Sequence, residues 1–229
     1  LPLAVQNDID MEIKQMLDLG IIERFTCAYN SPLVLVKKSD GSNRVRVDFW
    51  HLNKVLVDDA EPIPRVDAVF AKVAGRKYFS KLDLTKGYWQ IPLDEASKAK
   101  TAFSCARGLF QFRFMPFGLK TTVQTFTKLM QIVLHGLQNV EHYIDDILVA
   151  TNSWPEHVKT LQEVFRRLQV AAITVKPTKC QIGFQAITFL GHTLGMGHIA
   201  ALPDTIEKIQ SAPRPLNKKQ LRSFLGLTG

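Results

Sequence analysis

Cysteine is scarce in this sequence, and no long hydrophobic run occurs in it. The three cysteines, Cys27, Cys105 and Cys180, are odd in number and form no CxxC pair, which argues against a disulfide framework and a zinc knuckle. No apolar stretch approaches the roughly 20 residues of a membrane helix, and residues 1–8 lack the basic start and apolar core of a signal peptide. These absences predict a soluble protein from a reducing, intracellular and cytoplasmic setting.

The charged side chains are unevenly divided between the two signs. The sequence has 29 Lys and Arg against 21 Asp and Glu, a formal net charge of +8, and 46% of its 229 residues are hydrophobic. This composition predicts a globular chain with a substantial core, in one large domain or two modest ones. The positive excess favours partners with dense negative charge, nucleic acid above all, although many basic proteins bind nothing acidic. Because the sequence starts without Met and stops directly after an apolar run, we expect it to be a piece of a longer protein.

Patterns of apolar residues predict a mixture of helices and hairpins. A helix is expected at residues 9–17, capped by Asn7 and Asp8 and stopped by Gly20. Further helices are expected at residues 66–73, 123–137 and 153–168, with a last basic helix from Asn217. Strands or hairpins are expected at residues 33–49, 78–84 and 102–114, the last turning at Arg107 and Gly108, with short strands around Thr174, Phe184 and Phe189. The absence of regular βαβ alternation indicates an α+β fold.

The hairpin at residues 33–49 has a basic face. Val45 and Val47 alternate with Arg44 and Arg46, so the arginines are expected on one face and the valines on the other, packed face. The charged face is suited to a ligand, and an exposed basic edge that discourages strand pairing is the alternative.

Asp145 and Asp146 form the most unusual pair in the sequence, because two adjacent carboxylates lie within an apolar strand context. We expect the pair to form a two-residue turn that brings both side chains to one site. If this turn meets the strand that carries Asp83, three carboxylates converge as hard oxygen ligands for Mg²⁺. Two such ions support nucleotidyl transfer by in-line displacement at phosphorus. Taken alone, the pair is more often a solvated turn, because Asp is a favoured turn residue.

The motifs around these aspartates resemble those of reverse transcriptases. Tyr143–Asp146 is similar to their YxDD motif, and KLDL at residues 81–84 is similar to the segment with the preceding metal aspartate. The resemblance covers nearly the whole chain, in the form found in gypsy-like long-terminal-repeat retrotransposon Pol polyproteins. The segments that carry it are Leu19–Phe49, Leu52–Lys54, Lys77–Leu93, Lys100–Phe103, Met115–Leu119, Tyr143–Thr151, Phe189–His192 and Leu221–Leu227.

The resemblance implies a role for each matching residue. Asp83, Asp145 and Asp146 would bind two catalytic Mg²⁺ ions, with Mn²⁺ as a substitute. The nucleotide-binding residues would be Lys37, Arg44, Leu84, Thr85, Gly87, Tyr88, Phe117 and Gly118. Among them Tyr88 would exclude a ribose 2′-hydroxyl, whereas an isolated aromatic residue is more often part of a core. The primer grip would be formed by Phe189, Leu190, Gly191 and His192.

The resemblance also implies a right-hand polymerase fold and its partners. The fingers would comprise residues 1–58 and 91–121, the palm residues 59–90 and 122–202, and the start of the thumb residues 203–229. The partners would be an RNA or DNA template with its primer and deoxynucleoside triphosphates, with no membrane. Flanking ribonuclease H and integrase segments of the same polyprotein, and virus-like particles as the location, are further expectations.

Two places depart from the family pattern. Trp50 stands where the family usually has Arg, and it would either stack on a base or pack at the surface. Residues 120–127 read KTTVQTFT where the family typically has TNAPATFQ, so they lack the Pro and the final Gln, and the helix entry is expected to differ. The function predicted is reverse transcription. A catalytically silent nucleic-acid-binding remnant is the alternative, and a nucleotide cyclase is a more distant one.

Overall fold

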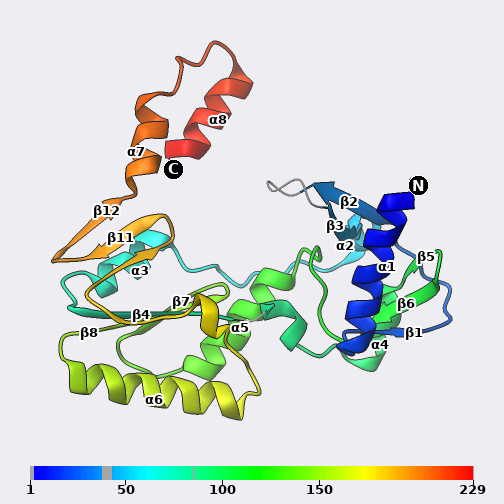
Figure 1. Ribbon diagram of the computed structural model, residues 1–229, viewed down its shortest axis with the longest axis horizontal. Helices are drawn as coiled ribbons and strands as arrows, with labels where there is room; N and C mark the ends of the chain where they lie inside the picture. Colours follow the sequence, from blue (N-terminus) through cyan, green and yellow to red (C-terminus); the bar gives the residue numbers. More distant parts are fainter. Residues whose placement is uncertain (1–2, 38–42, 85, 229) are drawn as a thin grey trace. The chain divides into compact units, whose positions relative to one another are not determined.

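The computed structural model describes residues 3–37, 43–84 and 86–228, without the side chains of residues 3–5, 44, 227 and 228. The chain forms two compact units, each assembled from three segments. The first unit contains Leu1–Ile63, Leu84–His135 and Leu168–Thr174, and the second contains Pro64–Asp83, Gly136–Arg167 and Val175–Gly229. The ribbon in Figure 1 shows the elements of both units.

The first unit combines small antiparallel sheets with helices. Helix α1 (Leu3–Asp18) is followed by a sheet in the order β1 (Ile22–Arg24), β6 (Gly108–Phe112), β5 (Phe103–Cys105), and by the hairpin of β2 (Leu33–Lys37) and β3 (Asn43–Val47). Its core joins α1 to these strands through Ile13, Phe49, Phe103 and Phe110. The remaining elements are α2 (Trp50–Val55), η1 (Gly87–Gln90), α4 (Glu95–Lys98), η2 (Ala99–Thr101) and α5 (Thr122–Leu134).

The second unit is built on a four-stranded antiparallel sheet. The strand order is β7 (Val140–Tyr143), β8 (Asp146–Thr151), β4 (Tyr78–Asp83), β9 (Gln181–Phe184). Another antiparallel sheet follows, in the order β10 (Ala186–Phe189), β11 (His192–Gly195), β12 (His198–Ala201). The helices are α3 (Val66–Val73), α6 (Trp154–Val170, whose last turn belongs to the first unit), α7 (Pro203–Gln210) and α8 (Lys218–Thr228), with the short η3 (Pro177–Lys179).

The two faces of the four-stranded sheet have different neighbours, because successive residues of a strand point to opposite faces. Phe79 of β4 and its partner Ala150 of β8 pack with α3 and with Phe189 of β10. On the opposite face, Ser80 is hydrogen-bonded to His157 of α6. The odd-numbered residues of β4 therefore face α3 and β10, and Asp83 belongs to this set.

Most predicted elements are confirmed, and several boundaries are wrong. Helix α1 already begins at Leu3, so Asn7 and Asp8 lie inside it and do not cap it, while Gly20 follows it with φ +66° as predicted. The second hairpin turns at residues 106–107, one residue early, because Gly108 pairs with Cys105 in the ladder. The helix predicted to reach residue 137 ends at Leu134, before Gly136 at φ +73°.

Around Thr174 the structure has no strand, so this prediction is wrong. The backbone N–H and the hydroxyl of Thr174 both donate to Oε1 of Gln90, at 2.6 and 3.1 Å. Only a single-residue bridge at Val175 follows, next to a 2.8 Å hydrogen bond from Lys176 N–H to the Asp83 carbonyl. Helices α2, α4 and α7 and strands β1, β11 and β12 were not predicted. None of the described helices combines the length and apolar character needed to cross a membrane.

Candidate polymerase active site

Asp83 and Asp146 lie directly opposite each other on neighbouring strands. They are register partners in the antiparallel ladder of β4 and β8, a pairing that places two Cα atoms about 4.5–5.5 Å apart with both side chains on one face. Both side chains are largely buried, with 20% and 18% of their surface exposed. Leu82 and Leu84 on either side of Asp83 are buried. The predicted alternation is therefore confirmed, and two carboxylates share one face of the sheet.

Asp145 lies in the turn next to this pair. The turn consists of Ile144 and Asp145, because Tyr143 pairs with Asp146 across the β7–β8 hairpin. The prediction of a turn made of both aspartates is thus wrong, since Asp146 is already the first residue of β8 and is held by its pairing with Asp83. Asp145 is exposed, while Asp146 is not.

The backbone of this turn is strained at Ile144. Its φ of +54° lies in the left-handed region, which costs an L residue with a Cβ roughly 1–2 kcal/mol and is least favourable for a β-branched side chain. Such strain persists only where the surrounding structure enforces it, and it is concentrated at functional sites. The ladder that fixes Tyr143 and Asp146 supplies this constraint.

Two lysines balance the aspartates. Nζ of Lys81 lies 3.0 Å from Oδ2 of Asp146, and Nζ of Lys179 lies 3.2 Å from Oδ2 of Asp83. Burial raises the pKa of Asp146 above its ordinary value; Lys81 opposes this rise, and the charges of Asp145 and Asp83 add to it. The charges of Asp145 and Asp83 therefore act on the Asp146 carboxylate, and two lysine ammonium groups offset part of the negative charge.

The three aspartates have the right chemistry to bind a divalent cation, but their side chains are not arranged as a complete set of metal ligands. Carboxylate oxygens are the ligands that Mg²⁺ prefers, and a cation would offset both the burial and the smaller repulsion between carboxylates that raise the pKa of Asp146. Among the residues that the structure describes, however, no three His, Cys, Asp or Glu side chains are arranged to hold a metal ion. The lysine ammonium groups meet the carboxylates instead.

An aromatic cluster in the first unit surrounds Tyr88. The ring of Tyr88 meets the rings of Phe117 and Phe126 edge-on, with centroids 5.1 and 5.6 Å away. The guanidinium of Arg46 lies over Phe117, 4.8 Å from its centroid. The structure thus brings together two of the predicted nucleotide-pocket residues, Tyr88 and Phe117.

Gly118 is held next to this cluster. Its φ is +100°, and its carbonyl accepts a 2.8 Å hydrogen bond from Nδ2 of Asn53. Gly87 is buried at the start of η1, Leu84 is buried, and Lys37 is exposed at the end of β2. Thr85 and the side chain of Arg44 lie outside the described residues. Trp50 is 56% exposed, and Nζ of Lys54 lies 3.3 Å from its ring centroid.

The predicted primer-grip segment forms a tight turn between β10 and β11. Phe189 pairs with His192, and both intervening residues, Leu190 and Gly191, have positive φ values of +47° and +76°, the pattern of a type I′ hairpin turn. The ring of His192 meets that of Phe70 at 4.9 Å, and Phe189 is fully buried. Together with the aspartates, this segment belongs to the second unit.

Three residues of the second unit were not singled out from the sequence: two lysines beside the aspartates, and a histidine on the opposite face of the sheet. Lys81 and Lys179 pair with the aspartates, and His157 is buried between Ser80 and Thr151, at 2.7 and 2.9 Å. Lys81 was detectable, because it lies two positions before Asp83 and therefore on the same strand face. Lys179 and His157 could not be recognised from the sequence, because their partners lie far away along the chain.

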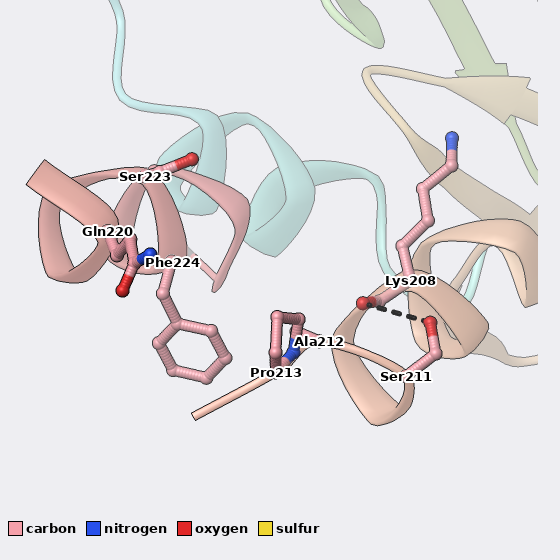
Figure 2. A pocket seen from close by; sticks show the side chains of 8 residues that line it. Lys208, Ser211, Ala212, Pro213, Gln220, Ser223 and Phe224 are labelled. Atoms are coloured by element: carbon pink, nitrogen blue, oxygen red, sulfur yellow. Dashed lines mark hydrogen bonds between the residues drawn. The ribbon is translucent and has the colours of Figure 1, made fainter. Parts of the chain in front are cut away.

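A cavity lies between α7 and α8, and none of its lining residues is a predicted site residue. It has a volume of about 590 Å³ (Figure 2). Its lining residues are Lys208, Ser211, Ala212, Pro213, Gln220, Ser223, Phe224 and Gly226. Figure 2 shows Phe224 on α8 and Pro213 of the connecting segment among the residues that line this cavity.

Comparison with known families decides the classification of the chain. Residues 36–194 match the family model described as reverse transcriptase (RNA-dependent DNA polymerase). This chain belongs to the reverse transcriptase family. The matched region contains all three aspartates and the turn of the primer-grip segment.

Curated relatives of this reverse transcriptase chain are retrotransposon polyproteins. It is 38% identical to the retrovirus-related Pol polyprotein from transposon 297 of Drosophila melanogaster, over 100% of the chain and 22% of that protein. It is 32% identical to the transposon Tf2-3 polyprotein of Schizosaccharomyces pombe, over 99% of the chain and 17% of that protein. The chain spans about a fifth of the length of these relatives. The predicted kinship with long-terminal-repeat retrotransposon polymerases is confirmed.

Solved structures confirm the predicted fold. A foamy viral protease–reverse transcriptase in complex with double-stranded DNA matches with a TM-score of 0.88 and 28% identity, over 96% of this chain and 39% of that one. The foamy viral enzyme in complex with an RNA/DNA hybrid matches with a TM-score of 0.87 and 26% identity, over 99% and 31%. The α+β, right-hand polymerase fold is therefore that of a reverse transcriptase.

Proposed function

We propose that this chain carries out template-directed DNA synthesis from deoxynucleoside triphosphates on an RNA or DNA template. The observation that carries the proposal is the pairing of Asp83 with Asp146, beside Asp145 in the adjoining turn, in a chain of the reverse transcriptase family. A primer 3′-hydroxyl attacks the α-phosphate of the nucleotide, and pyrophosphate leaves.

The three aspartates would hold two Mg²⁺ ions, for which Mn²⁺ is a substitute. Bound there, the ions supply activation of the attacking hydroxyl and stabilisation of the leaving oxygen. Lys179 is 57% exposed and is able to leave Asp83 when a cation arrives. The exposed turn position of Asp145 leaves its carboxylate accessible to the same cation.

The nucleotide pocket is assigned to residues of the first unit. Lys37 and Arg44 would hold the triphosphate, a role suited to their charge. Leu84, Thr85, Gly87, Phe117 and Gly118 would line the pocket. Tyr88 would exclude a ribose 2′-hydroxyl, and the two phenylalanine rings that hold it edge-on support this role. Phe189–His192 would place the primer terminus.

The partner is primed template, bound mainly through its phosphates. The net charge of +8 supports this, and it implies salt-sensitive and largely sequence-independent binding. The foamy viral relatives in complex with double-stranded DNA and with an RNA/DNA hybrid support both template types. We assign residues 1–58 and 91–121 to the fingers, 59–90 and 122–202 to the palm, and 203–229 to the start of the thumb.

The relatives' greater length supports a place within a Pol polyprotein. Ribonuclease H and integrase segments would flank this chain there. Its site of action would be the cytoplasm, in virus-like particles.

Primer extension with Mg²⁺ tests the proposed activity. The wild-type chain is compared with the Asp145→Asn variant on RNA and DNA templates with a labelled primer. Loss of a metal carboxylate removes stabilisation of the reacting charges, so incorporation should fall at least about a hundredfold. If both chains incorporate nucleotides equally, or if neither incorporates any, the proposal is overturned. The chain would then be a silent nucleic-acid-binding remnant.

A further inference from the structure

Lys81 occupies an unusual place for a lysine. It lies in the middle of β4, which has β8 on one side and β9 on the other. Its neighbours Ser80 and Leu82 are completely buried on the opposite face. Only 23% of the Lys81 side chain is exposed, although lysine is almost never found in such positions without a partner.

The partner of Lys81 is one of the aspartates of the candidate active site. Its ammonium lies 3.0 Å from Oδ2 of Asp146, which is the diagonal neighbour of Lys81 in the β4–β8 ladder. The same ammonium lies 5.8 Å from the ring centroid of Phe189, which is fully buried. Lys81 is thus confined between the sheet, the ring of Phe189 and the carboxylate.

Two other lysines of the second unit form ion pairs of a different kind. Lys179 pairs with Asp83 but is 57% exposed, and Lys72 pairs with Glu141 at 2.9 Å but is 64% exposed. Both side chains can swing into solvent at little cost. Lys81 has little room to do so, because only 23% of its side chain is exposed and its ammonium lies beside the buried ring of Phe189. Its positive charge therefore stays near the aspartates when a cation binds.

We propose that Lys81 is a resident counter-ion that positions the Asp146 carboxylate and weakens divalent-cation binding by the aspartates until a triphosphate supplies further oxygen ligands. The role of the cation rests on the proposed function. A charge fixed a few ångströms from the cation site repels a divalent ion, whereas phosphate oxygens add ligands and negative charge. Lys81 thereby couples metal binding to arrival of the nucleotide.

Mn²⁺ binding to the purified chain, without nucleotide or nucleic acid, tests this inference. Free Mn²⁺ is followed by electron paramagnetic resonance for the wild type, Lys81→Met, Lys81→Arg and Lys72→Met. Lys81→Met keeps the aliphatic stem against Phe189 but removes the charge, so its Kd for Mn²⁺ should be about three- to tenfold lower than that of the wild type. Lys81→Arg and the matched control Lys72→Met should stay within about twofold of the wild type.

Thermal unfolding of the same variants separates this role from a merely structural one. A structural role lowers the melting temperature of Lys81→Met and leaves its Mn²⁺ affinity unchanged. An unchanged or weaker affinity in Lys81→Met overturns the inference, even if the wild type extends primers. If the wild type binds no Mn²⁺ and extends no primer, the proposed function fails together with it.

Discussion

Tyr88 is fixed by its neighbours more firmly than an isolated surface tyrosine. Its ring meets Phe117 and the fully buried Phe126 edge-on, at 5.1 and 5.6 Å. Such contacts hold an aromatic ring in one orientation. A ring that closes the space beneath a bound sugar must be held in this way to exclude a hydroxyl group.

Replacement of Tyr88 should change sugar selectivity more than activity. Tyr88→Ala removes the ring, so the preference for deoxynucleotides over ribonucleotides, measured as the ratio of kcat/KM values, should fall by about tenfold or more. Tyr88→Phe keeps the ring and serves as the matched control, with selectivity close to that of the wild type. A Tyr88→Ala chain with unchanged selectivity would show that Tyr88 is only a core residue.

His157 is a buried residue whose hydrogen bonds require the neutral ring. Gly183 N–H donates to Ser80 Oγ, which leaves the Ser80 hydroxyl proton for Nε2 of His157. Thr151 Oγ1 donates to the carbonyl of Ser153 and accepts from Nδ1. A proton added at Nε2 would leave the Ser80 hydroxyl without an acceptor. Consistently, burial lowers the pKa of His157 below its ordinary value of 6.5.

Because His157 is buried in its neutral form, we expect the free energy of unfolding to fall in mild acid. Below about pH 6.5 the unfolded chain binds a proton that the folded chain does not, so the free energy of unfolding falls as the pH falls. Urea denaturation between pH 7.5 and pH 5.5 measures the slope. His157→Gln should have a shallower slope, and His142, whose pKa burial also lowers, contributes a slope of the same sign in both chains. Identical slopes would contradict the buried, neutral histidine.

At the scale of elements, the hairpins could be predicted and their exact turns could not. The sequence correctly places a turn at the aspartate pair, but the pairing of Asp146 with Asp83 shifts it to Ile144 and Asp145. The two paired residues are 63 positions apart in the sequence (146 − 83), so no local sequence pattern reveals their pairing. Asp8, which was predicted to cap α1, lies inside that helix and accepts a 2.7 Å hydrogen bond from the distant Asn43.

Gly195 is required by the close approach of two chain segments in the β10–β11–β12 sheet. A Cβ atom there would lie 2.5 Å from the carbonyl oxygen of Gln185 and 2.6 Å from Cα of Ala186, and its φ is +142°. Backbone atoms cannot move aside as a flexible side chain does. This glycine therefore controls the approach of β11 to the start of β10, the strand that ends at Phe189.

Two alanine substitutions distinguish crowding from backbone strain. Gly195→Ala combines both and should lower the free energy of unfolding by more than about 2 kcal/mol. Gly197→Ala has φ +78° but nothing within 4 Å of the added Cβ, so it should cost only about 1 kcal/mol. Urea denaturation measures both values. Equal losses would show that the approach at Gly195 is not tight.

At the scale of the whole molecule, the order of motifs along the chain was more informative than composition. The charge of +8 indicates a polyanionic partner but no reaction, whereas the segments from Leu19 to Leu227 predicted the reverse transcriptase family, which the match of residues 36–194 confirms. Composition also left open one or two domains, and the structure has two units that interleave along the chain. Such interleaving depends on contacts between distant segments.

Single-turnover incorporation of one deoxynucleotide by the Asp83→Asn variant tests the central claim most directly. The exposed Asp67 of α3, paired with Arg65 at 2.7 Å, provides the matched control Asp67→Asn in the same unit. If Asp83 shares cations with Asp145 and Asp146, Asp83→Asn should lose at least about a hundredfold in rate while Asp67→Asn keeps the wild-type rate. A folded Asp83→Asn chain that incorporates the nucleotide as fast as the wild type would contradict the claim.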